Sequence, residues 1–178
     1  MAAPADSRQV RAVVLDEATI AARVGALGRE ITAAFPDGEL LVLGLLKGSF
    51  IFLGDLVRRI ERPLQVDFLV AASYGGAMVS SGEVRLVYAP ETELRDRHVL
   101  LVEDIIDSGR TVNRIVRVLR ERGMRSLNLC TLLHKHVAAG LELEPAFVGF
   151  DAPASFLVGY GLDHAEEFRN LPYIASLT

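Results

Sequence analysis

The sequence has very little cysteine, since Cys130 is the only one among its 178 residues. A single cysteine excludes an intramolecular disulfide and suits a reducing compartment, so we expect a cytoplasmic protein. Cys130 lies inside the apolar segment 127–133. At such a position a small buried hydrophobic residue is a more common role for cysteine than a nucleophile.

Long hydrophobic runs are also absent. No apolar stretch approaches the roughly 18 residues of a membrane span, and residues 1–9 lack the apolar segment of a signal peptide. We therefore expect no membrane association. Residues 1–12 are interpreted as a flexible N-terminal tail and residues 13–178 as a single domain.

An excess of positive charge is missing too. The formal net charge is −4, with 23 acidic residues against 19 lysines and arginines, which argues against nucleic acid as a partner. Hydrophobic residues, in contrast, make up 51% of the chain, and the mean hydropathy of +0.30 is high for a soluble monomer of this size. We therefore expect buried subunit interfaces in a homodimer or homotetramer.

Helix and strand patterns alternate along the chain. Apolar residues at intervals of three to four predict a helix that begins after Asp16 and ends near Phe35, and the continuous apolar run 40–46 predicts a strand covered on both faces. The same reasoning predicts helices at 50–60 and 111–122, and strands at 66–72, 84–88, 99–102, 127–133, 147–150 and 156–158. This alternation is typical of an α/β fold with a mostly parallel sheet, in which ligands bind at the carboxyl ends of the strands.

The strand at 99–102 leads directly into an acid-rich segment. It contains the acids Glu103, Asp104 and Asp107, followed by Ser-Gly-Arg-Thr at 108–111 and then a helical pattern. Backbone N–H groups at a tight turn and at a helix start attract phosphate, and carboxylates accept hydrogen bonds from sugar hydroxyls. The segment therefore predicts a site for a phosphorylated sugar, with Asp107 left for chemistry.

Two other common phosphate motifs are excluded. The interval from Gly44 to Ser49 is too short for the P-loop pattern Gly-x-x-x-x-Gly-Lys-Ser/Thr. The pair Gly159 and Gly161 lacks both the third glycine and the later acid of a dinucleotide-binding motif.

Residues 102–111, with the sequence Val-Glu-Asp-Ile-Ile-Asp-Ser-Gly-Arg-Thr, resemble the phosphoribosyl-pyrophosphate signature of the type I phosphoribosyltransferases, in its hypoxanthine(-guanine) version. Further matches follow in the order of the family, at 46–48, 66–68, 73–74, 131–135, 147–150, 156–163 and 168–169. The resemblance spans about residues 40–173. It implies the type I phosphoribosyltransferase fold, which has a mostly parallel central sheet flanked by helices and a small hood from the chain ends over the active site.

The resemblance implies a purine salvage enzyme, a glycosyltransferase that transfers a pentosyl group. In this family a 6-oxopurine, hypoxanthine or guanine, is joined to phosphoribosyl pyrophosphate (PRPP), giving IMP or GMP and pyrophosphate. The reaction needs Mg²⁺, a cradle for the 5′-phosphate, a base near the purine and a way to exclude water.

The PRPP site implied by the resemblance comes from four segments. Backbone amides and hydroxyls of 107–111 are expected to hold the 5′-phosphate, and Glu103 and Asp104 to hold the ribose hydroxyls directly or through Mg²⁺. The peptide bond before Lys47 can be cis in this family, and Ser73 begins a glycine- and serine-rich flap that closes over the sugar. The full set is Leu46, Lys47, Gly48, Ser73, Tyr74, Glu103, Asp104, Ile106, Asp107, Ser108, Gly109, Arg110, Thr111 and Arg169.

The metal and purine sites are implied in the same way. Lys135 is expected to donate to the purine O6 and Phe156 to stack on the base, and His164 stands where the family has tyrosine. The expected metal-binding residues are Glu103, Asp104 and Asp163. The expected purine-binding residues are Ile105, Lys135, Phe156, Leu157 and Asp163.

Asp107 is the expected catalytic residue, either as the general base that accepts the N7 proton or in a positioning role without full transfer. His134 and His136 point to the face opposite Lys135, and the absence of a third ligand nearby in sequence argues against zinc.

Two alternatives remain beside this enzyme. One is a nucleic-acid-binding regulator on the same scaffold, against which Asp107, Lys135, Asp163 and the acidic balance argue. The other is an enzyme for another base, such as xanthine or a pyrimidine. Lys135 and Phe156 fit 6-oxopurines, and the ranking of hypoxanthine, guanine and xanthine depends on fine pocket geometry.

Overall fold

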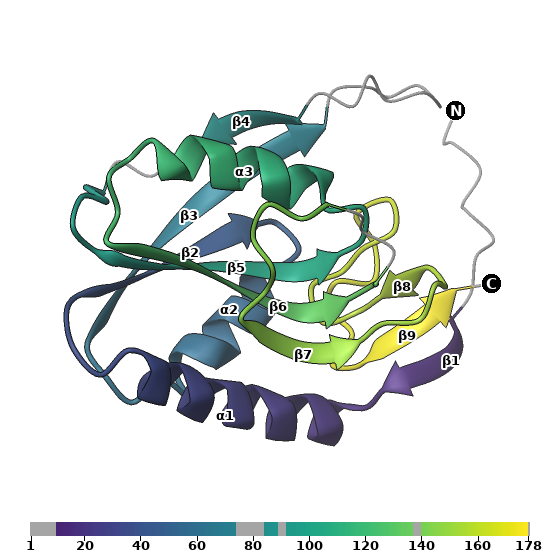
Figure 1. Cartoon of the computed structure of the whole chain (residues 1–178). Helices are drawn as coiled ribbons and strands as arrows, with labels where there is room; N and C mark the ends of the chain where they lie inside the picture. The colour runs from purple at the N-terminus through teal and green to yellow at the C-terminus, as the bar shows by residue number, and fades with distance from the viewer. Residues whose placement is uncertain (1–9, 74–83, 89–91, 137–139, 178) are drawn as a thin grey trace.

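The computed structural model describes residues 10–73, 84–88, 92–136 and 140–177. Its strands are β1 (Val10–Leu15), β2 (Leu40–Leu46), β3 (Leu64–Ser73), β4 (Val84–Tyr88), β5 (His98–Ile106), β6 (Ser126–His134), β7 (Phe147–Asp151), β8 (Leu157–Val158) and β9 (Ile174–Leu177). Its helices are α1 (Glu17–Ala34), α2 (Phe50–Val57) and α3 (Arg110–Arg120). These elements form a six-stranded sheet between helices and a second sheet of three strands (Figure 1).

The central sheet has the strand order β4-β3-β2-β5-β6-β7. Five of its strands are parallel, and β4 pairs antiparallel with β3 at the edge. Alternate residues of β2 and β5 are buried against α1 and α2 on one face and against α3 on the other. This confirms the predicted α/β class, with a mostly parallel sheet flanked by helices.

The second sheet joins the two ends of the chain. Its order is β1-β9-β8, and Val10 of β1 lies opposite Leu177 of β9. It forms the hood expected over the carboxyl ends of the central strands (Figure 1). The expected tail of residues 1–12 is therefore wrong at residues 10–12, because their pairing partner lies at the far end of the chain and leaves no local signal. Residues 1–9 lie outside the described residues.

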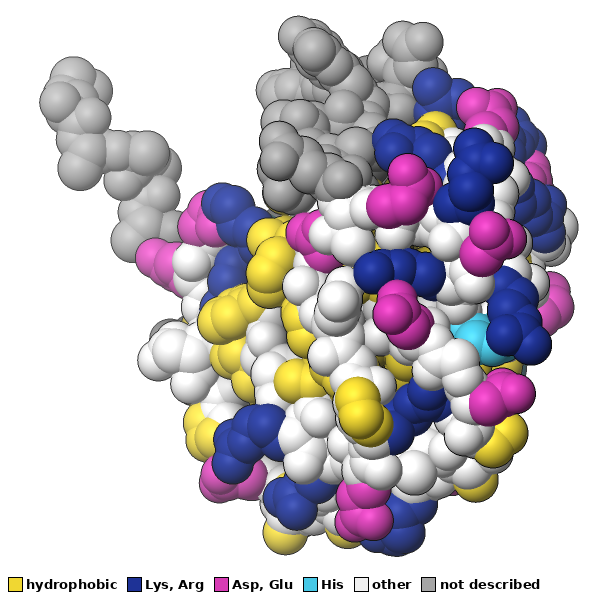
Figure 2. All heavy atoms as spheres, turned by 90° about the vertical axis from the view of Figure 1, so that its left-hand side faces the viewer, with side chains coloured by type: hydrophobic (Ala, Val, Ile, Leu, Met, Phe, Trp, Pro, Cys, Tyr) yellow, Lys and Arg dark blue, Asp and Glu magenta, His cyan; other side chains and the backbone are white. Residues whose placement is uncertain are grey.

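One part of the surface is apolar. Phe50, Val66 and Phe68 are exposed. Because Val66 and Phe68 lie in register with Val42 and Gly44 of β2, all four share the sheet face on which α2 packs. Figure 2 shows hydrophobic side chains gathered on the left of one face of the molecule, with lysines and arginines interleaved among acids on the right.

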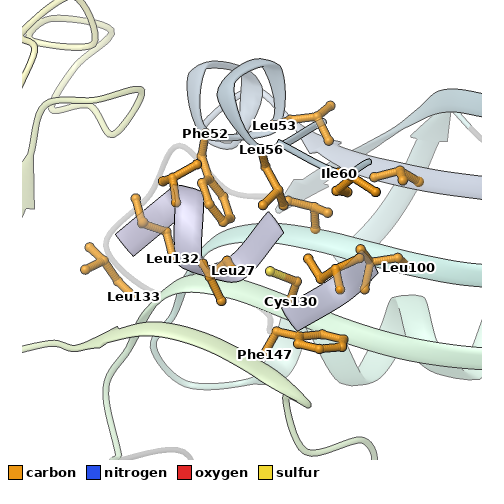
Figure 3. Packing of buried hydrophobic residues seen from close by; sticks show 14 of the residues in the cluster. Leu27, Phe52, Leu53, Leu56, Ile60, Leu100, Cys130, Leu132, Leu133 and Phe147 are labelled. Atoms are coloured by element: carbon orange, nitrogen blue, oxygen red, sulfur yellow. The ribbon is translucent and has the colours of Figure 1, made fainter. Parts of the chain in front are cut away.

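The core between α1, α2 and the sheet is continuous. Asp16 caps α1 by accepting a hydrogen bond from the backbone N–H of Thr19 at 2.7 Å, as its sequence position predicts. Figure 3 shows Leu27, Phe52 and other apolar side chains meeting around Cys130. Burial raises the pKa of the Cys130 thiol well above its usual range, which fits the predicted structural role for this cysteine.

The most consequential difference from the predicted elements is the length of β5. The strand expected at 99–102 runs to Ile106, because its ladder with β6 continues to the pair of Ile106 and His134. Glu103 and Asp104 therefore lie inside the strand rather than after it. Another difference is that α2 ends at Val57 instead of residue 60.

Among the described residues, none of the helices is long and apolar enough to cross a membrane.

Candidate functional site

A cavity of about 650 Å³ opens at the carboxyl ends of the central strands, under the hood. A smaller cavity of about 230 Å³ adjoins it around the turn between β5 and α3. The two cavities share Asp104, Ile105 and Asp107. This is the edge of the sheet at which the parallel topology predicts ligand binding.

The smaller cavity is formed by the turn that leads into α3. Gly109 is the N-cap of this helix and has a φ of +75°, a left-handed conformation that glycine adopts without steric cost. Its carbonyl accepts the N–H of Asn113 at 2.9 Å, which starts the helix. The free N–H groups of the first helical turn and the hydroxyls of Ser108 and Thr111 suit an anionic phosphate group.

Glu103 and Asp104 lie in the last part of β5 and are both buried. Burial, and then the neighbouring Asp104 carboxylate, raise the pKa of Glu103 well above its usual value. Within the described part of the chain, Oε2 of Glu103 has no hydrogen-bond partner. A buried carboxylate oxygen without a partner is costly, so this position calls for a cation or a hydroxyl donor.

The donor set fits Mg²⁺ only together with a substrate. Across residues 10–73, 84–88, 92–136 and 140–177, no three histidine, cysteine or acidic side chains are grouped to hold a metal. Mg²⁺ typically uses one or two carboxylates and completes its octahedron with water and substrate oxygens. Glu103 and Asp104 supply two carboxylates of this kind, and water and substrate oxygens would supply the other ligands.

The loop between β2 and α2 closes one side of the larger cavity. The peptide bond between Leu46 and Lys47 is cis, a geometry that the family resemblance allows. Gly48 lies so close to Asp104 that a Cβ at this position would collide with its carboxylate. Ser49 holds the loop by donating from Oγ to the carbonyl of Leu45 at 2.6 Å.

Lys135 and Asp107 lie side by side at one wall of the larger cavity. Their Nζ and Oδ2 atoms are 3.3 Å apart, and the lysine side chain is only 10% exposed, against 60% for the aspartate. The backbone N–H of Lys135 donates to the carbonyl of Ile106 at 2.9 Å, which fixes β6 beside the acid-rich turn. An ammonium group and a carboxylate thus meet at one wall of the site.

Arg169 and Asp163 line the same cavity from the segment between β8 and β9. Arg169 Nη2 lies 2.9 Å from Asp163 Oδ1 and 3.3 Å from Glu166 Oε2, while Nη1 donates to the carbonyl of Gly161 at 2.8 Å. Glu166 also lies 3.2 Å from Lys47 Nζ. Hydrogen bonds from Lys47 and then Arg169 lower the pKa of the Glu166 carboxyl.

The histidines beside Lys135 contact each other and an acid. The rings of His134 and His136 have centroids 4.3 Å apart, and His136 Nε2 lies 2.6 Å from Asp151 Oδ1. Burial, and then the neighbouring His136, lower the pKa of His134.

Most of the predicted site residues line one of the two cavities. Residues of the larger cavity are Leu46, Lys47, Gly48, Asp104, Ile105, Asp107, Lys135, Phe156, Leu157, Asp163 and Arg169. Residues of the smaller cavity include Glu103, Ile106, Ser108, Gly109 and Thr111.

Among the predicted residues whose side chains the structure describes, only Arg110 lines neither cavity. Arg110 is the exposed first residue of α3, and Ser73 ends β3 two residues after Ala71, which is part of the lining. Tyr74 and the rest of the expected flap to Gly82 lie outside the described residues.

The sequence interpretation missed four residues of the larger cavity, which are Val70, Ala71, Leu162 and Glu166. Glu166 had the clearest available signal, because it lies midway between Asp163 and Arg169. The other three have apolar side chains that nothing in the sequence separates from core residues.

Comparison with known proteins places this geometry in context. The family model described as the phosphoribosyl transferase domain matches residues 12–165. A hypoxanthine phosphoribosyltransferase of Salmonella typhimurium is 42% identical over 167 residues, covering 93% of this chain and 94% of the relative. A hypoxanthine-guanine phosphoribosyltransferase of Bacillus subtilis is 42% identical over 168 residues, covering 94% of this chain and 93% of the relative.

Solved structures agree with the sequence relatives. A hypoxanthine phosphoribosyltransferase of Staphylococcus aureus superposes with a TM-score of 0.89 at 37% identity, over 95% of this chain and 92% of that chain. A hypoxanthine-guanine phosphoribosyltransferase of Bacillus anthracis also has a TM-score of 0.89, at 36% identity, over 96% of this chain and 100% of that chain.

Proposed function

The chain belongs to the phosphoribosyl transferase family, and we infer that within it the protein is a hypoxanthine phosphoribosyltransferase of purine salvage. It transfers the 5-phosphoribosyl group of PRPP to hypoxanthine, giving IMP and pyrophosphate. The observation that carries this function is the larger cavity, which joins Asp107 and Lys135 to Asp104 and Lys47 at one edge of the sheet.

We propose that PRPP spans both cavities. Its 5′-phosphate lies in the smaller cavity, on the N–H groups that begin α3 and the hydroxyls of Ser108 and Thr111. The ribose hydroxyls donate to Glu103 and Asp104, which supplies the partner that Glu103 Oε2 lacks. Residues of this cradle act by binding and orienting the sugar, so that C1′ faces the larger cavity.

The pyrophosphate group is proposed to lie between Lys47 and Arg169. Both cations line the larger cavity, and each contacts Glu166. The planar fork of an arginine binds two phosphate oxygens at once, which suits a leaving group that gains charge as its bond to C1′ breaks.

The purine is proposed to lie between Lys135, Asp107 and Phe156. Lys135 donates from Nζ to O6, and Asp107 accepts the proton of N7 while the ring nitrogen N9 forms its bond to C1′. The 3.3 Å contact between Lys135 and Asp107 places the two groups close enough to serve one bicyclic base. Adenine has an amino group in place of O6 and presents no acceptor to Lys135 there.

Glu103, Asp104 and Asp163 are proposed as the residues that hold Mg²⁺. When bound, Mg²⁺ neutralises charge on the PRPP oxygens and on the departing pyrophosphate. Glu103 and Asp104 support this assignment through their burial and the unpartnered Oε2 atom. Asp163 supports it more weakly, because its two oxygens are already near Arg169 and the N–H of Glu166.

We propose guanine as a second substrate. The Bacillus subtilis relative is named for both bases, and guanine carries the same O6 and N7 as hypoxanthine. Xanthine carries the same O6 and N7, so Lys135 and Asp107 do not separate it from guanine, and the rate comparison below does. Pyrimidines have no five-membered ring and offer no N7 proton to Asp107. On the face drawn in Figure 2, lysines and arginines are interleaved with acids rather than gathered in a basic patch.

We also propose a homo-oligomer, a dimer or a tetramer, in the cytoplasm. The exposed side chains of Val66 and Phe68 on β3 and of Phe50 on α2 support a subunit interface. The single cysteine, which is buried, supports the cytoplasmic location.

The experiment that tests the function compares product formation from PRPP with hypoxanthine, guanine, xanthine and adenine, each with and without Mg²⁺. We expect IMP formation with hypoxanthine, GMP formation with guanine, and a strong dependence on Mg²⁺. Equal rates with adenine would contradict the role of Lys135, and no IMP under any condition would contradict the function.

A further inference from the structure

His164 is held in a tight turn of the hood. Its N–H donates to the carbonyl of Glu167 at 3.2 Å, and the N–H of Glu167 donates back to the carbonyl of His164 at 3.0 Å. Ala165 and Glu166 between them both have positive φ angles, of 52° and 66°. The two backbone hydrogen bonds fix the direction in which the His164 side chain leaves the turn.

The ring of His164 contacts the ring of Phe156. Their centroids are 5.4 Å apart and the ring planes are nearly perpendicular, at 88°. This is the edge-to-face geometry that aromatic pairs prefer, because the positive edge of one ring meets the negative face of the other.

Phe156 needs such a contact more than most phenylalanines do. It is 49% exposed although it lines the larger cavity, and it directly precedes the short strand β8. An exposed ring with little packing loses rotamer freedom when a base stacks on it, and this loss weakens binding. A neighbour that already restricts the ring removes part of that cost.

We propose that His164 is a positioning residue for the base, which holds the Phe156 ring in the orientation that stacks on the purine. His164 is not among the described residues that line the larger cavity, so it acts through Phe156 rather than by touching the substrate. The inference rests on the proposed function in one respect, that Phe156 stacks on the base. It concerns a position at which this chain carries histidine where the family has tyrosine.

The test measures steady-state kinetics of the full chain with hypoxanthine and PRPP for His164→Ala and for the ring-free but polar His164→Gln. We expect the KM for hypoxanthine to rise about two- to tenfold, the range that an edge-to-face ring pair supports. The KM for PRPP and kcat are expected to stay within about twofold of the wild type. His164→Phe and His164→Tyr keep a ring edge and are expected to restore the wild-type KM for hypoxanthine.

Two further variants separate positioning from other roles. Glu167→Gln changes an exposed side chain of the same turn and is expected to leave all constants unchanged. In a Phe156→Ala background, His164→Ala is expected to raise the KM for hypoxanthine no further, because the ring that His164 holds is gone.

Several results would overturn the inference. One is an unchanged or lowered KM for hypoxanthine in both His164→Ala and His164→Gln. Another is a KM for hypoxanthine in His164→Phe and His164→Tyr that stays as high as in the ring-free variants. The third is that His164→Ala raises this KM by the same factor with Phe156→Ala as without it. A wild-type enzyme that makes no IMP would instead refute the proposed function. If His164→Ala does not fold, His164→Gln and the two aromatic variants still decide the question.

Discussion

Asp107 is the residue on which the chemistry depends most. It lines both cavities and its carboxylate lies 3.3 Å from the Lys135 ammonium group. For Asp107→Asn we expect kcat to fall by a factor of about 10² to 10⁴, the usual contribution of a general base. The affinity for PRPP, measured by calorimetry, is expected to change little, because backbone groups make most of the cradle. Full turnover in this variant would remove Asp107 as the base.

Lys135 determines which base is accepted. Its side chain is 90% shielded from solvent, so a hydrogen bond to O6 is made at a site with little competing water. A hydrogen bond to a charged group contributes about 1.5–3 kcal/mol, and Lys135→Ala is therefore expected to raise the KM for hypoxanthine by about tenfold or more. The KM for PRPP serves as the internal control. Equal increases in both constants would contradict recognition of O6.

His134 gives the protein a dependence of stability on pH. Its pKa is lowered by burial and then by the neighbouring His136. As the pH falls below about 6.5, the usual histidine pKa, the unfolded chain binds a proton that folded His134 does not yet bind. The free energy of unfolding therefore decreases on acidification through this window, until the pH falls below the folded pKa.

We expect His134→Gln to lose less stability than the wild type between pH 7.5 and pH 5.5. Urea unfolding at the two pH values measures this difference. His136→Gln is the comparison. It removes the second cause of the lowered His134 pKa and leaves burial, the first cause, so it is expected to keep most of the loss of stability on acidification. The same loss of stability in wild type and His134→Gln would refute the assignment.

At the scale of elements, the loop after β2 and the end of β5 fit together through one glycine. A Cβ at Gly48 would collide with the buried carboxylate of Asp104. Gly48→Ala is therefore expected to displace Asp104 and to raise the KM for PRPP by about tenfold or more, the effect of losing a hydrogen bond to a charged group.

Gly54→Ala in α2 is the matched control for this substitution. A Cβ at Gly54 meets nothing within 4 Å, and alanine is the better helix former by roughly 0.5–1 kcal/mol. This variant is expected to keep its KM for PRPP and to unfold at slightly higher urea concentrations. Normal PRPP kinetics in Gly48→Ala would show that the loop does not need this close approach.

The elements differ in how far the sequence predicted them. Helix α1 and strand β2 have strong local signals, the Asp16 cap and a continuous apolar run, and both are confirmed. The extension of β5 through Glu103 and Asp104 was not predictable from hydrophobicity. The apolar run stops at Val102, and two adjacent acids after such a run predict that the strand has ended. β1 and β9 were missed because each depends on the other, across the whole length of the chain.

The residues of the candidate site also differ in how far the sequence predicted them. The acid-rich turn and Gly109 were predicted because phosphate chemistry needs an unusual local sequence. Glu166, which contacts Lys47 and Arg169, was missed because its role depends on a contact 119 residues apart in sequence.

At the scale of the whole molecule, the exposed apolar residues bear on assembly. Val66 and Phe68 share the sheet face beside α2, and a stable subunit interface would bury them. We expect the wild type to elute as a dimer or a tetramer in size-exclusion chromatography with light scattering. A double variant, Val66→Asp with Phe68→Asp, is expected to shift this mass toward the monomer.

A control for that shift is Val13→Asp on β1, whose exposed side chain lies on the hood instead. A wild type of monomeric mass would contradict the proposed interface, and so would an unchanged mass in the double variant.

The central claim is that the acid-rich end of β5 and the start of α3 bind PRPP. Calorimetric titration of PRPP with Mg²⁺ into the wild type tests it most directly, with the double variant Glu103→Gln and Asp104→Asn as the comparison. We predict saturable binding by the wild type and a loss of affinity of at least about tenfold in the variant, since hydrogen bonds to charged groups are removed. No heat of binding in the wild type, or equal affinity in the variant, would contradict the account.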